Sequence, residues 1–354
     1  MYKISVIIPV YNAENTINRA IDSILNQNWR GNLVDDIEIV AVDDKSSDGT
    51  KRILSDYADK YPNVKTIFLD KNSGHPSHPR NVGIENADAE YVMFLDNDDE
   101  YCENFCQTVF DAITSKDVDV VTCNWYNVLG SKIEKIKLDL NYGELQHDGD
   151  YLIVDSLNAI LADDCMIWKS IYTRSFLIDN NIFFPLQVCE DVLFLINAYL
   201  KMDKMIYINN FYGYKRNFRG DSLSAVPKAN VILEYLNAFF DVQELLESSI
   251  DFEKKGLDRF YFLRKQIDSN LFKIIRLEKT EEMNICLDKL YELESRFQFD
   301  NSIPKSSFSP VMKTINFFVL KNRRKLTIFL IRLSQIFLKF VYTFIIRESS
   351  LMIK

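Results

Sequence analysis

The first hundred residues alternate between continuous apolar runs and amphipathic segments. Residues 3–11 read KISVIIPVY, a β-branched run that is typical of a strand covered on both faces. The segment that follows, residues 12–27, places its apolar side chains at helical spacing. Three further apolar runs, IEIVAVDD, VKTIFLD and AEYVMFLDND, are separated by a helical pattern each time. This alternation predicts βαβ units and an α/β fold with a mostly parallel sheet flanked by helices.

Polar side chains gather where each of these four strands is expected to end. In chain order the groups are Tyr11 and Asn12, Asp43 and Asp44, residues 72–81, and residues 96–99. The carboxyl ends of parallel strands meet at one edge of a sheet, and ligands of open α/β sheets bind there. The sequence therefore predicts a ligand site at this edge.

In the rest of the chain the pattern of apolar and polar residues changes twice. Strand and helix patterns mix up to about residue 225, and residues 226–300 are largely helical in pattern. The tract NSIPKSSFSP at 301–310 is typical of a linker, and the apolar segment after it carries Arg332, Lys339 and Arg347 on one helical stripe. We therefore expect a domain at 1–225, a helical region at 226–300, and a basic amphipathic C-terminal helix region at 301–354.

Charge is divided unevenly along the chain. The segment from residue 305 to the end holds ten Lys or Arg and one acid, whereas the whole chain has a net charge of −9, so the first 304 residues carry −18. An acidic body argues against nucleic acid as a partner, and a basic apolar tail predicts contact with an anionic surface.

The tail helix has two interpretations, packing in a homo-oligomer or lying on a membrane surface. Its cations at Arg332 and Lys339 argue against a spanning helix. No basic leader precedes the first strand, so we expect a cytoplasmic protein, peripheral at the inner face of the plasma membrane if the tail binds lipid.

The fourth strand ends in an acidic tip, YVMFLDNDDEY at residues 91–101. Asp96, Asp98 and Asp99 stand close together there, and like charges that close disfavour ionisation of one another. A basic side chain, salt solution or a divalent cation could neutralise them. Hard oxygen ligands on a loop suit Mg²⁺ or Mn²⁺, whereas the plainer interpretation is a solvated turn before the next helix.

With these motifs assembled, the sequence resembles the family 2 glycosyltransferases. The segments PVYN, VDDKSSDGT, NSGHPSHPRNVGI, EYVMFLDNDD and CEDVLF occur in the family's order. The resemblance covers residues 1–225 and implies a GT-A fold, with a nucleotide-binding half at 1–104 and an acceptor half at 105–225. It also implies a UDP-sugar donor, Mn²⁺ or Mg²⁺ as cofactor, and inversion at the anomeric carbon. Two departures are Lys45, where the family commonly has Gly, and HPRN in place of ARN.

The resemblance assigns metal and nucleotide roles to particular residues. Asp96 and Asp98 form an Asp-x-Asp motif, in which Asp98 contacts the metal directly and Asp96 binds the metal or the ribose. Asp43 or Asp44 is expected to bind the uracil ring, and the choice between them stays open, as does a purely structural Asx-turn. The nucleotide-sugar-binding residues implied in this way are Pro9, Tyr11, Asn12, Asp43, Asp44, Asn72, Arg80, Asp96, Asn97, Arg216 and Arg219.

Catalysis is expected to fall to the acids of CEDVLF. Direct displacement needs a carboxylate that takes the proton of the acceptor hydroxyl, and an inverting transferase needs one such acid. By resemblance Asp191 is this base, and Glu190 orients the acceptor. The plainer interpretation is that both acids favour the N-terminus of the apolar helix that follows.

Together these features predict a metal-dependent inverting glycosyltransferase. It would move a hexose or N-acetylhexosamine from a UDP-sugar to a bacterial cell-surface glycan (capsule, exopolysaccharide or teichoic acid), with a glycan or lipid-linked acceptor. One alternative is a non-catalytic glycan-binding or scaffold protein, which would be expected to lose the acids that are present here. Another is a sugar nucleotidyltransferase, which needs a Gly-rich phosphate loop that PVYNAENT does not provide.

Overall fold

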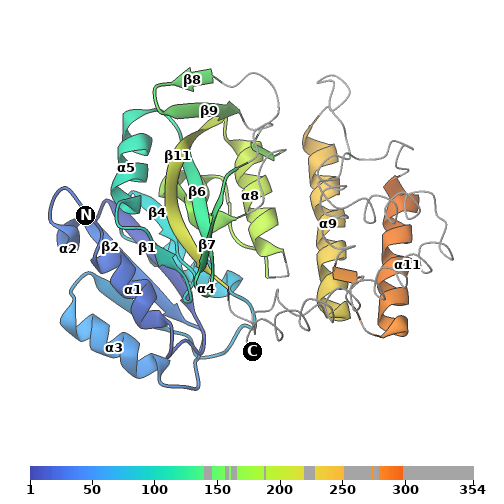
Figure 1. The fold of residues 1–354 in the computed structure, drawn as a ribbon, viewed down its shortest axis with the longest axis horizontal. Coiled ribbons are helices and arrows are strands. Elements are labelled where there is room, and N and C mark those ends of the chain that lie inside the picture. Colours follow the sequence, from blue (N-terminus) through green and yellow to red (C-terminus); the bar gives the residue numbers. More distant parts are fainter. Residues whose placement is uncertain are drawn as a thin grey trace, which may run out of the picture. The chain divides into compact units, whose positions relative to one another are not determined.

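The computed structural model describes residues 1–138, 146–155, 159–160, 166–186, 189–218, 228–250, 273–274, 277 and 279–297. The chain divides into two compact units, Met1–Gly220 and Asp221–Lys354 (Figure 1). The predicted boundaries at residues 225 and 300, and the predicted basic helix at 301–354, lie outside the described residues. Among the helices that are described, none combines the length and the apolar character needed to cross a membrane.

Four parallel strands form the N-terminal half of the sheet. They are β1 (Ile4–Val10), β2 (Ile37–Asp43), β3 (Val64–Phe68) and β4 (Tyr91–Phe94), in the spatial order β3-β2-β1-β4. Every residue of β1 and β2 is buried, as their continuous apolar runs predict for strands covered on both faces. The predicted α/β fold is confirmed, and its polar strand ends lie along one edge.

Strands of both directions extend the sheet beyond β4. Next to it lies β10 (Ser170–Thr173), followed by β6 (Val120–Leu129), β11 (Lys204–Asn217), β9 (Tyr151–Asp155) and β8 (Gln146–Asp148). Strand β11 runs parallel to β6 and antiparallel to both β9 and the short β5 (Glu100–Tyr101). Strand β7 (Lys132–Ile136) pairs with β6. The β5–β11 pairing brings the C-terminal end of β11 beside the acidic tip that follows β4.

Helices cover both faces of this sheet. In Figure 1, α1 (Ile17–Leu25), α3 (Thr50–Lys60) and α5 (Phe105–Ser115) lie along one side, and α4 (Ser77–Asn86) and α8 (Glu190–Lys201) along the other. The smaller helices of this unit are α2 (Leu33–Asp36), η1 (Ile167–Lys169) and α7 (Arg174–Asp179). Helix α1 begins at Ile17 and not near residue 12, because residues 11–16 form the turn that carries the polar end of β1.

Two glycines allow helices to approach the sheet closely. A Cβ on Gly83 of α4 would lie 2.3 Å from Ile7 Cγ2 of β1, and a Cβ on Gly213 of β11 would lie 2.2 Å from Phe105 Cδ2 of α5. Real Cβ atoms do not approach that closely, so neither contact tolerates a larger residue without a shift. The Gly83 contact matters for function, because α4 also carries Arg80.

The second unit contains two described helices, α9 (Ala229–Ser249) and α11 (Thr280–Phe297), which pack against each other. Both lie within residues 226–300, where the sequence pattern is helical. Helix α9 buries an apolar stripe that includes Ile232, Leu236 and Phe239, and the Cys286 thiol of α11 contacts the Ala229 carbonyl oxygen.

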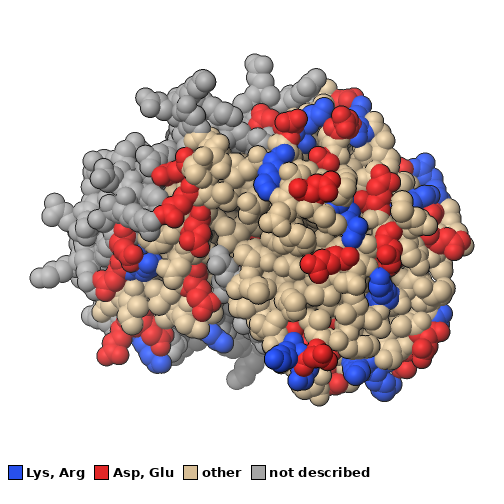
Figure 2. Space-filling view, turned by 180° about the vertical axis from the view of Figure 1, so that it is seen from behind, with Lys and Arg blue, Asp and Glu red and all other residues tan. Residues whose placement is uncertain are grey.

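The surface of the first unit mixes both signs of charge. Figure 2 shows Lys and Arg standing among Asp and Glu on the coloured part of this face, with wide uncharged areas between them. The acidic excess of the body is therefore not gathered into a single acidic patch on this side.

We predict that Gly83→Ala lowers the free energy of unfolding by about 2 kcal/mol. Overpacking against Ile7 costs up to about 3 kcal/mol, and the better helix propensity of Ala returns about 1 kcal/mol. Thermal unfolding measures the change. In an Ile7→Ala background, which removes the clashing methyl groups, the same substitution should cost nothing; a single Gly83→Ala variant as stable as the parent contradicts the close contact.

Candidate active site

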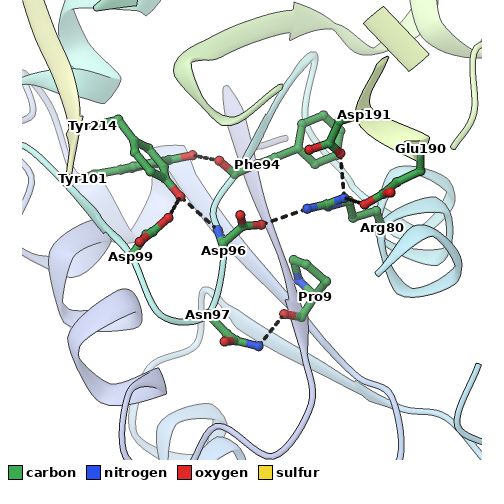
Figure 3. A network of polar contacts seen from close by, with 10 residues as sticks. All are labelled: Pro9, Arg80, Phe94, Asp96, Asn97, Asp99, Tyr101, Glu190, Asp191 and Tyr214. Atoms are coloured by element: carbon green, nitrogen blue, oxygen red, sulfur yellow. Dashed lines mark hydrogen bonds and ion pairs between the residues drawn. The ribbon is translucent and has the colours of Figure 1, made fainter. Parts of the chain in front are cut away.

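A buried arginine joins three carboxylates at the rim of the sheet (Figure 3). Arg80 of α4 is 3% exposed, and its guanidinium contacts Asp96 Oδ1 at 2.9 Å, Glu190 Oε1 at 3.0 Å and Asp191 Oδ1 at 2.8 Å. Asp96 follows β4, whereas Glu190 and Asp191 open α8, 110 and 111 residues after Arg80. One cation therefore ties the acidic tip to the acids of CEDVLF.

Local structure explains how each partner reaches this point. Helix α4 packs closely against β1 at Gly83, which lies one turn after Arg80. Helix α8 has Glu190 and Asp191 in its first turn, where acids interact favourably with the helix dipole. The residue before them, Cys189, has φ +66°, a left-handed conformation that is strained for a residue other than Gly. The sharp entry into α8 thus directs both acids toward Arg80.

The cluster holds more negative than positive charge. Burial raises the pKa of Asp191 to about 8, with Glu190 and Asp96 adding to the shift, while Arg80 and Arg216 lower the pKa. Burial alone would lower the pKa of Arg80, but its three acidic partners outweigh that effect and raise it. A quarter of the Asp191 side chain is exposed, so a substrate hydroxyl can reach it. A carboxyl group with a pKa near neutrality suits general base catalysis.

The acids of the β4 tip occupy different environments. Asp99 is buried, and its carboxylate accepts hydrogen bonds from the Tyr214 hydroxyl at 2.7 Å and the Asn217 backbone N–H at 2.6 Å. Burial and the charges of Asp96 and Asp98 raise the pKa of Asp99 to about 8. The Asp96 backbone N–H donates to the Tyr214 hydroxyl at 3.3 Å. Asp99 therefore fixes the loop from inside and leaves Asp96 and Asp98 as the acids for ligand chemistry.

The predicted metal ligands have the right donor atoms for a hard cation. Asp96 and Asp98 offer carboxylate oxygens, and the Asp96 side chain is 30% exposed. Within the described ranges, no group of three or more His, Cys, Asp or Glu is arranged to hold a metal by itself. Mg²⁺ usually takes one or two carboxylates together with substrate phosphates and water, so two acids fit a cation that arrives with a diphosphate.

The two acids at the end of β2 both order neighbouring loops. Asp43 accepts hydrogen bonds from the backbone N–H of Ser46, at 3.1 Å, and from its hydroxyl. Asp44 accepts from the backbone N–H and hydroxyl of Ser73, each at 2.9 Å, and its carbonyl oxygen accepts from Asn72 Nδ2 at 2.8 Å. The Asp43 side chain therefore closes the turn after β2, a structural role that does not depend on a ligand. Recognition of a uracil ring by either acid stays a prediction.

The first strand-end group is held to these loops. Asn12 Oδ1 accepts from the Ser47 backbone N–H at 2.8 Å, and Asn97 Nδ2 donates to the Pro9 carbonyl oxygen at 3.1 Å. The Tyr11 side chain is 49% exposed beside them. Pro9, Tyr11, Asn12 and Asn97 therefore lie around one rim, as the sequence predicts.

Lys45 adopts φ +60° in the turn after β2. Gly takes this conformation at no steric cost, which is why the resemblance places Gly there. In this chain a lysine occupies the left-handed conformation, so the backbone at Lys45 is strained.

Of the predicted nucleotide-sugar-binding residues near the end of β11, only Arg216 lies within the described part of the chain. Arg216 of β11 lies 4.6 Å, measured from its Cζ, from the ring centroid of Phe218, and it is near enough to Asp191 to lower the pKa of that acid. Arg219 lies outside the described residues. Binding of the nucleotide sugar by Arg216 stays a prediction.

Sequence reasoning missed three contributors to the site. Tyr214 bridges Asp96 and Asp99, Phe184 places its ring centroid 5.2 Å from the Arg80 guanidinium carbon, and Arg19 of α1 donates to the Asp98 carbonyl oxygen. Tyr214 lies two residues before Arg216 on the same strand, so their side chains point to the same face. This spacing could have indicated from the sequence that Tyr214 belongs to the site. Phe184 and Arg19 carry no local pattern that marks them.

The comparison with protein families identifies the domain. Residues 5–176 match the model of glycosyl transferase family 2. Residues 5–176 thus form a domain of that family. The predicted resemblance is therefore confirmed.

Bacterial relatives support the same family membership. A poly(ribitol-phosphate) beta-glucosyltransferase of Bacillus spizizenii is 32% identical over 79% of this chain and 43% of its own length. The poly(ribitol-phosphate) beta-N-acetylglucosaminyltransferase TarS of Staphylococcus aureus is 31% identical over 64% of this chain and 37% of its own. A cholesterol galactosyltransferase of Borreliella burgdorferi is 27% identical over 74% of both chains. The chain thus spans less than half the length of the first two relatives.

Solved structures share the fold. S. aureus TarS 1-349 in complex with UDP superimposes with a TM-score of 0.64 at 24% identity, covering 91% of both chains. The complex of the same fragment with UDP-GlcNAc has the same TM-score and covers 91% of this chain and 92% of that one. This likeness confirms the predicted GT-A fold.

We predict that Tyr214→Phe destabilises the protein more at high pH than at low pH. The raised pKa means that folded Asp99 stays protonated from about pH 4 to 8 while the unfolded chain loses that proton, so stability falls as pH rises through this window. Losing the hydroxyl costs roughly 1 kcal/mol at pH 5, where Asp99 is neutral, and roughly 2–3 kcal/mol at pH 9, where a charged acceptor is left.

Urea unfolding at both pH values measures this difference, and Tyr101→Phe is the matched control. Tyr101 is also buried, and its hydroxyl donates to the neutral Phe94 carbonyl oxygen at 2.7 Å. Its loss should be the same at both pH values. Equal pH dependence in the two variants would rule out the Asp99 assignment.

Proposed function

We propose that this protein is a metal-dependent inverting glycosyltransferase that moves a hexose or N-acetylhexosamine from a UDP-sugar to a bacterial cell-surface glycan. The observation that carries this proposal is the Arg80 cluster. It joins Asp96, on the side where the family motif implies the donor, to Asp191, the acid implied as base. A donor and an acceptor bound on the two sides of this cluster would have their reacting atoms brought together.

The proposed reaction is a direct displacement at the anomeric carbon. The acceptor hydroxyl gives its proton to the Asp191 carboxylate as its oxygen forms the new glycosidic bond. The bond from the anomeric carbon to the UDP oxygen breaks with its electron pair, so UDP leaves and the anomeric centre inverts. Glu190 lies beside Asp191 on the same turn and would orient the acceptor.

The negative charge that develops on UDP needs positive partners. Arg80 supplies one fixed positive charge beside Asp96. Arg216 supplies a second cation near the cluster. Asp96 and Asp98 would hold Mn²⁺ or Mg²⁺, which supplies positive charge to the departing diphosphate.

The choice of substrates rests on the relatives. Two of them are a glucosyltransferase and an N-acetylglucosaminyltransferase of poly(ribitol-phosphate). A third, of Campylobacter jejuni, is a GalNAc(5)-diNAcBac-PP-undecaprenol beta-1,3-glucosyltransferase. The TarS complexes hold UDP and UDP-GlcNAc. By this likeness we infer a UDP-sugar donor and a polymeric or lipid-linked glycan acceptor for this chain.

UDP release from UDP-sugars separates this function from the alternatives. Release of UDP from a UDP-sugar in the presence of Mn²⁺ supports transfer, whereas formation of a sugar nucleotide from a sugar phosphate and UTP would indicate a nucleotidyltransferase. If no UDP is released from UDP-glucose, UDP-galactose, UDP-GlcNAc or UDP-GalNAc, each tested with glycan acceptors, the result would favour a non-catalytic scaffold protein.

We predict that Asp191→Asn lowers kcat by about 10²–10⁴-fold, because general base catalysis contributes that much. In the parent, kcat/KM should rise with pH up to about 8 and then level off, since Asp191 must lose its proton to act. Glu190→Gln is the matched control, because Glu190 contacts the same Arg80 nitrogen at 3.0 Å. It should keep most of kcat and the pH-dependent rise. Loss of that rise in Glu190→Gln, with retention in Asp191→Asn, would reverse the two roles.

We also predict that EDTA abolishes UDP release and that Mn²⁺ restores it. Asp98→Ala should weaken Mn²⁺-dependent binding of UDP at least tenfold by calorimetry, since one of two protein ligands is lost. Asp56→Ala, on the exposed surface of α3, serves as the control and should bind normally. Equal UDP affinity with and without Mn²⁺ in the parent protein would refute the metal site.

A further inference from the structure

A cavity opens on the first unit, outside the cluster around Arg80. It has a volume of about 470 Å³, within the range of small-molecule sites, ~300–1,000 Å³. Its walls come from the loop before α5 and from β6, β7 and β11. The residues that give it its chemistry are Glu103, Asn104, Tyr126, Phe211, Tyr212 and Lys215.

Strand β11 separates this cavity from the proposed reaction site. Successive side chains of a strand point to opposite faces. Tyr214 and Arg216 act on Asp99 and Asp191, whereas Lys215, between them, lines the cavity. Gly213, the neighbour on the other side, faces Phe105 of α5. A register shift between Tyr212 and Tyr214 interrupts the alternation, so Tyr212 also lines the cavity although it has the parity of Tyr214. The cavity is therefore a separate pocket on the α5 side of the strand.

Aromatic rings remain accessible in its wall. Tyr126 and Tyr212 contact each other with ring centroids 5.0 Å apart, and neither they nor Phe211 are buried. Ile133, which also lines the cavity, is 61% exposed. The negative face of an aromatic ring attracts the C–H groups on the apolar face of a sugar ring. Glu103 and Asn104, both exposed, provide acceptors and donors for hydroxyl groups.

The charges of the pocket offset one another. Glu103 and Lys215 are of opposite sign, and the Lys215 ammonium also lies 3.9 Å from the Glu100 carboxylate. The Lys135 ammonium lies 5.2 Å from the Tyr212 ring centroid, a cation–π contact. A wall without net charge is a poor site for phosphate and a good one for a neutral polar ligand.

From this combination we propose that the pocket binds a neutral pyranose residue of a glycan chain, as a carbohydrate site separate from the Arg80 cluster. A polymeric glycan held here and at the reaction site would gain from effective concentration, because its second contact becomes intramolecular. The pocket should then lower KM for long acceptors and leave KM for short acceptors unchanged.

Saturation-transfer NMR tests the site without donor or metal. The probes are methyl β-glucoside and methyl N-acetyl-β-glucosaminide, added to the full chain. Saturation of their C–H protons is expected, and Tyr212→Ala and Tyr126→Ala should each weaken binding about three- to tenfold. Asn104→Ala, at an exposed position, should weaken binding without disturbing the strand.

Tyr61→Ala is the matched control. Tyr61 on the surface after α3 stacks on Tyr57 with centroids 6.0 Å apart and has the Lys60 ammonium 4.8 Å from its ring, so it reproduces the aromatic and cationic contacts of Tyr212 elsewhere. Its removal should leave the signal unchanged. No saturation in the parent, an equal signal in all variants, or tighter binding of glucose 1-phosphate than of the neutral glucoside would each overturn the proposal. The readout does not involve sugar transfer, so its failure and the failure of the proposed function are distinguishable.

Discussion

The site depends on one buried guanidinium shared by three carboxylates. Removing Arg80 from water is costly, and the cost is met only because Asp96, Glu190 and Asp191 all lie within 3.0 Å of it. The partners come from two parts of the fold: the loop after β4 supplies Asp96, the first turn of α8 supplies Glu190 and Asp191, and both parts meet at α4. The same contact therefore stabilises the rim and fixes the two acids on which the proposed chemistry depends.

The balance of charge in this cluster suits a ligand site more than a purely structural contact. Three carboxylates around one cation leave negative charge uncompensated, which accords with the raised pKa of Asp191 and with the cation that we propose at Asp96 and Asp98. Tyr214 keeps a fourth acid, Asp99, on the inner side of the loop. The two halves of the proposed reaction thus share a single electrostatic unit.

Much of the fold and the site rim could be predicted because their signals are local. The continuous apolar runs of β1 and β2 indicate buried parallel strands, and the polar groups after each strand indicate the ligand edge. The pairing of Arg80 with acids 110 and 111 residues away has no local signal, and neither does the inward role of Asp99. Lys45 shows the limit of the resemblance, since the turn forms with a lysine in a conformation that favours glycine. The expected C-terminal helix, Arg219 and the membrane or oligomer contact lie outside the described residues.

A double-mutant cycle between Arg80 and Asp191 measures the central contact most directly. The free energy of unfolding is determined at pH 9, where Asp191 is ionised, for Arg80→Met, Asp191→Asn and the double variant. A coupling energy of about 1–3 kcal/mol is predicted for this buried contact. The exposed pair Arg30–Asp111 serves as reference, with about 0.2–1 kcal/mol expected. A coupling for Arg80 and Asp191 no larger than that of the reference pair would contradict the account.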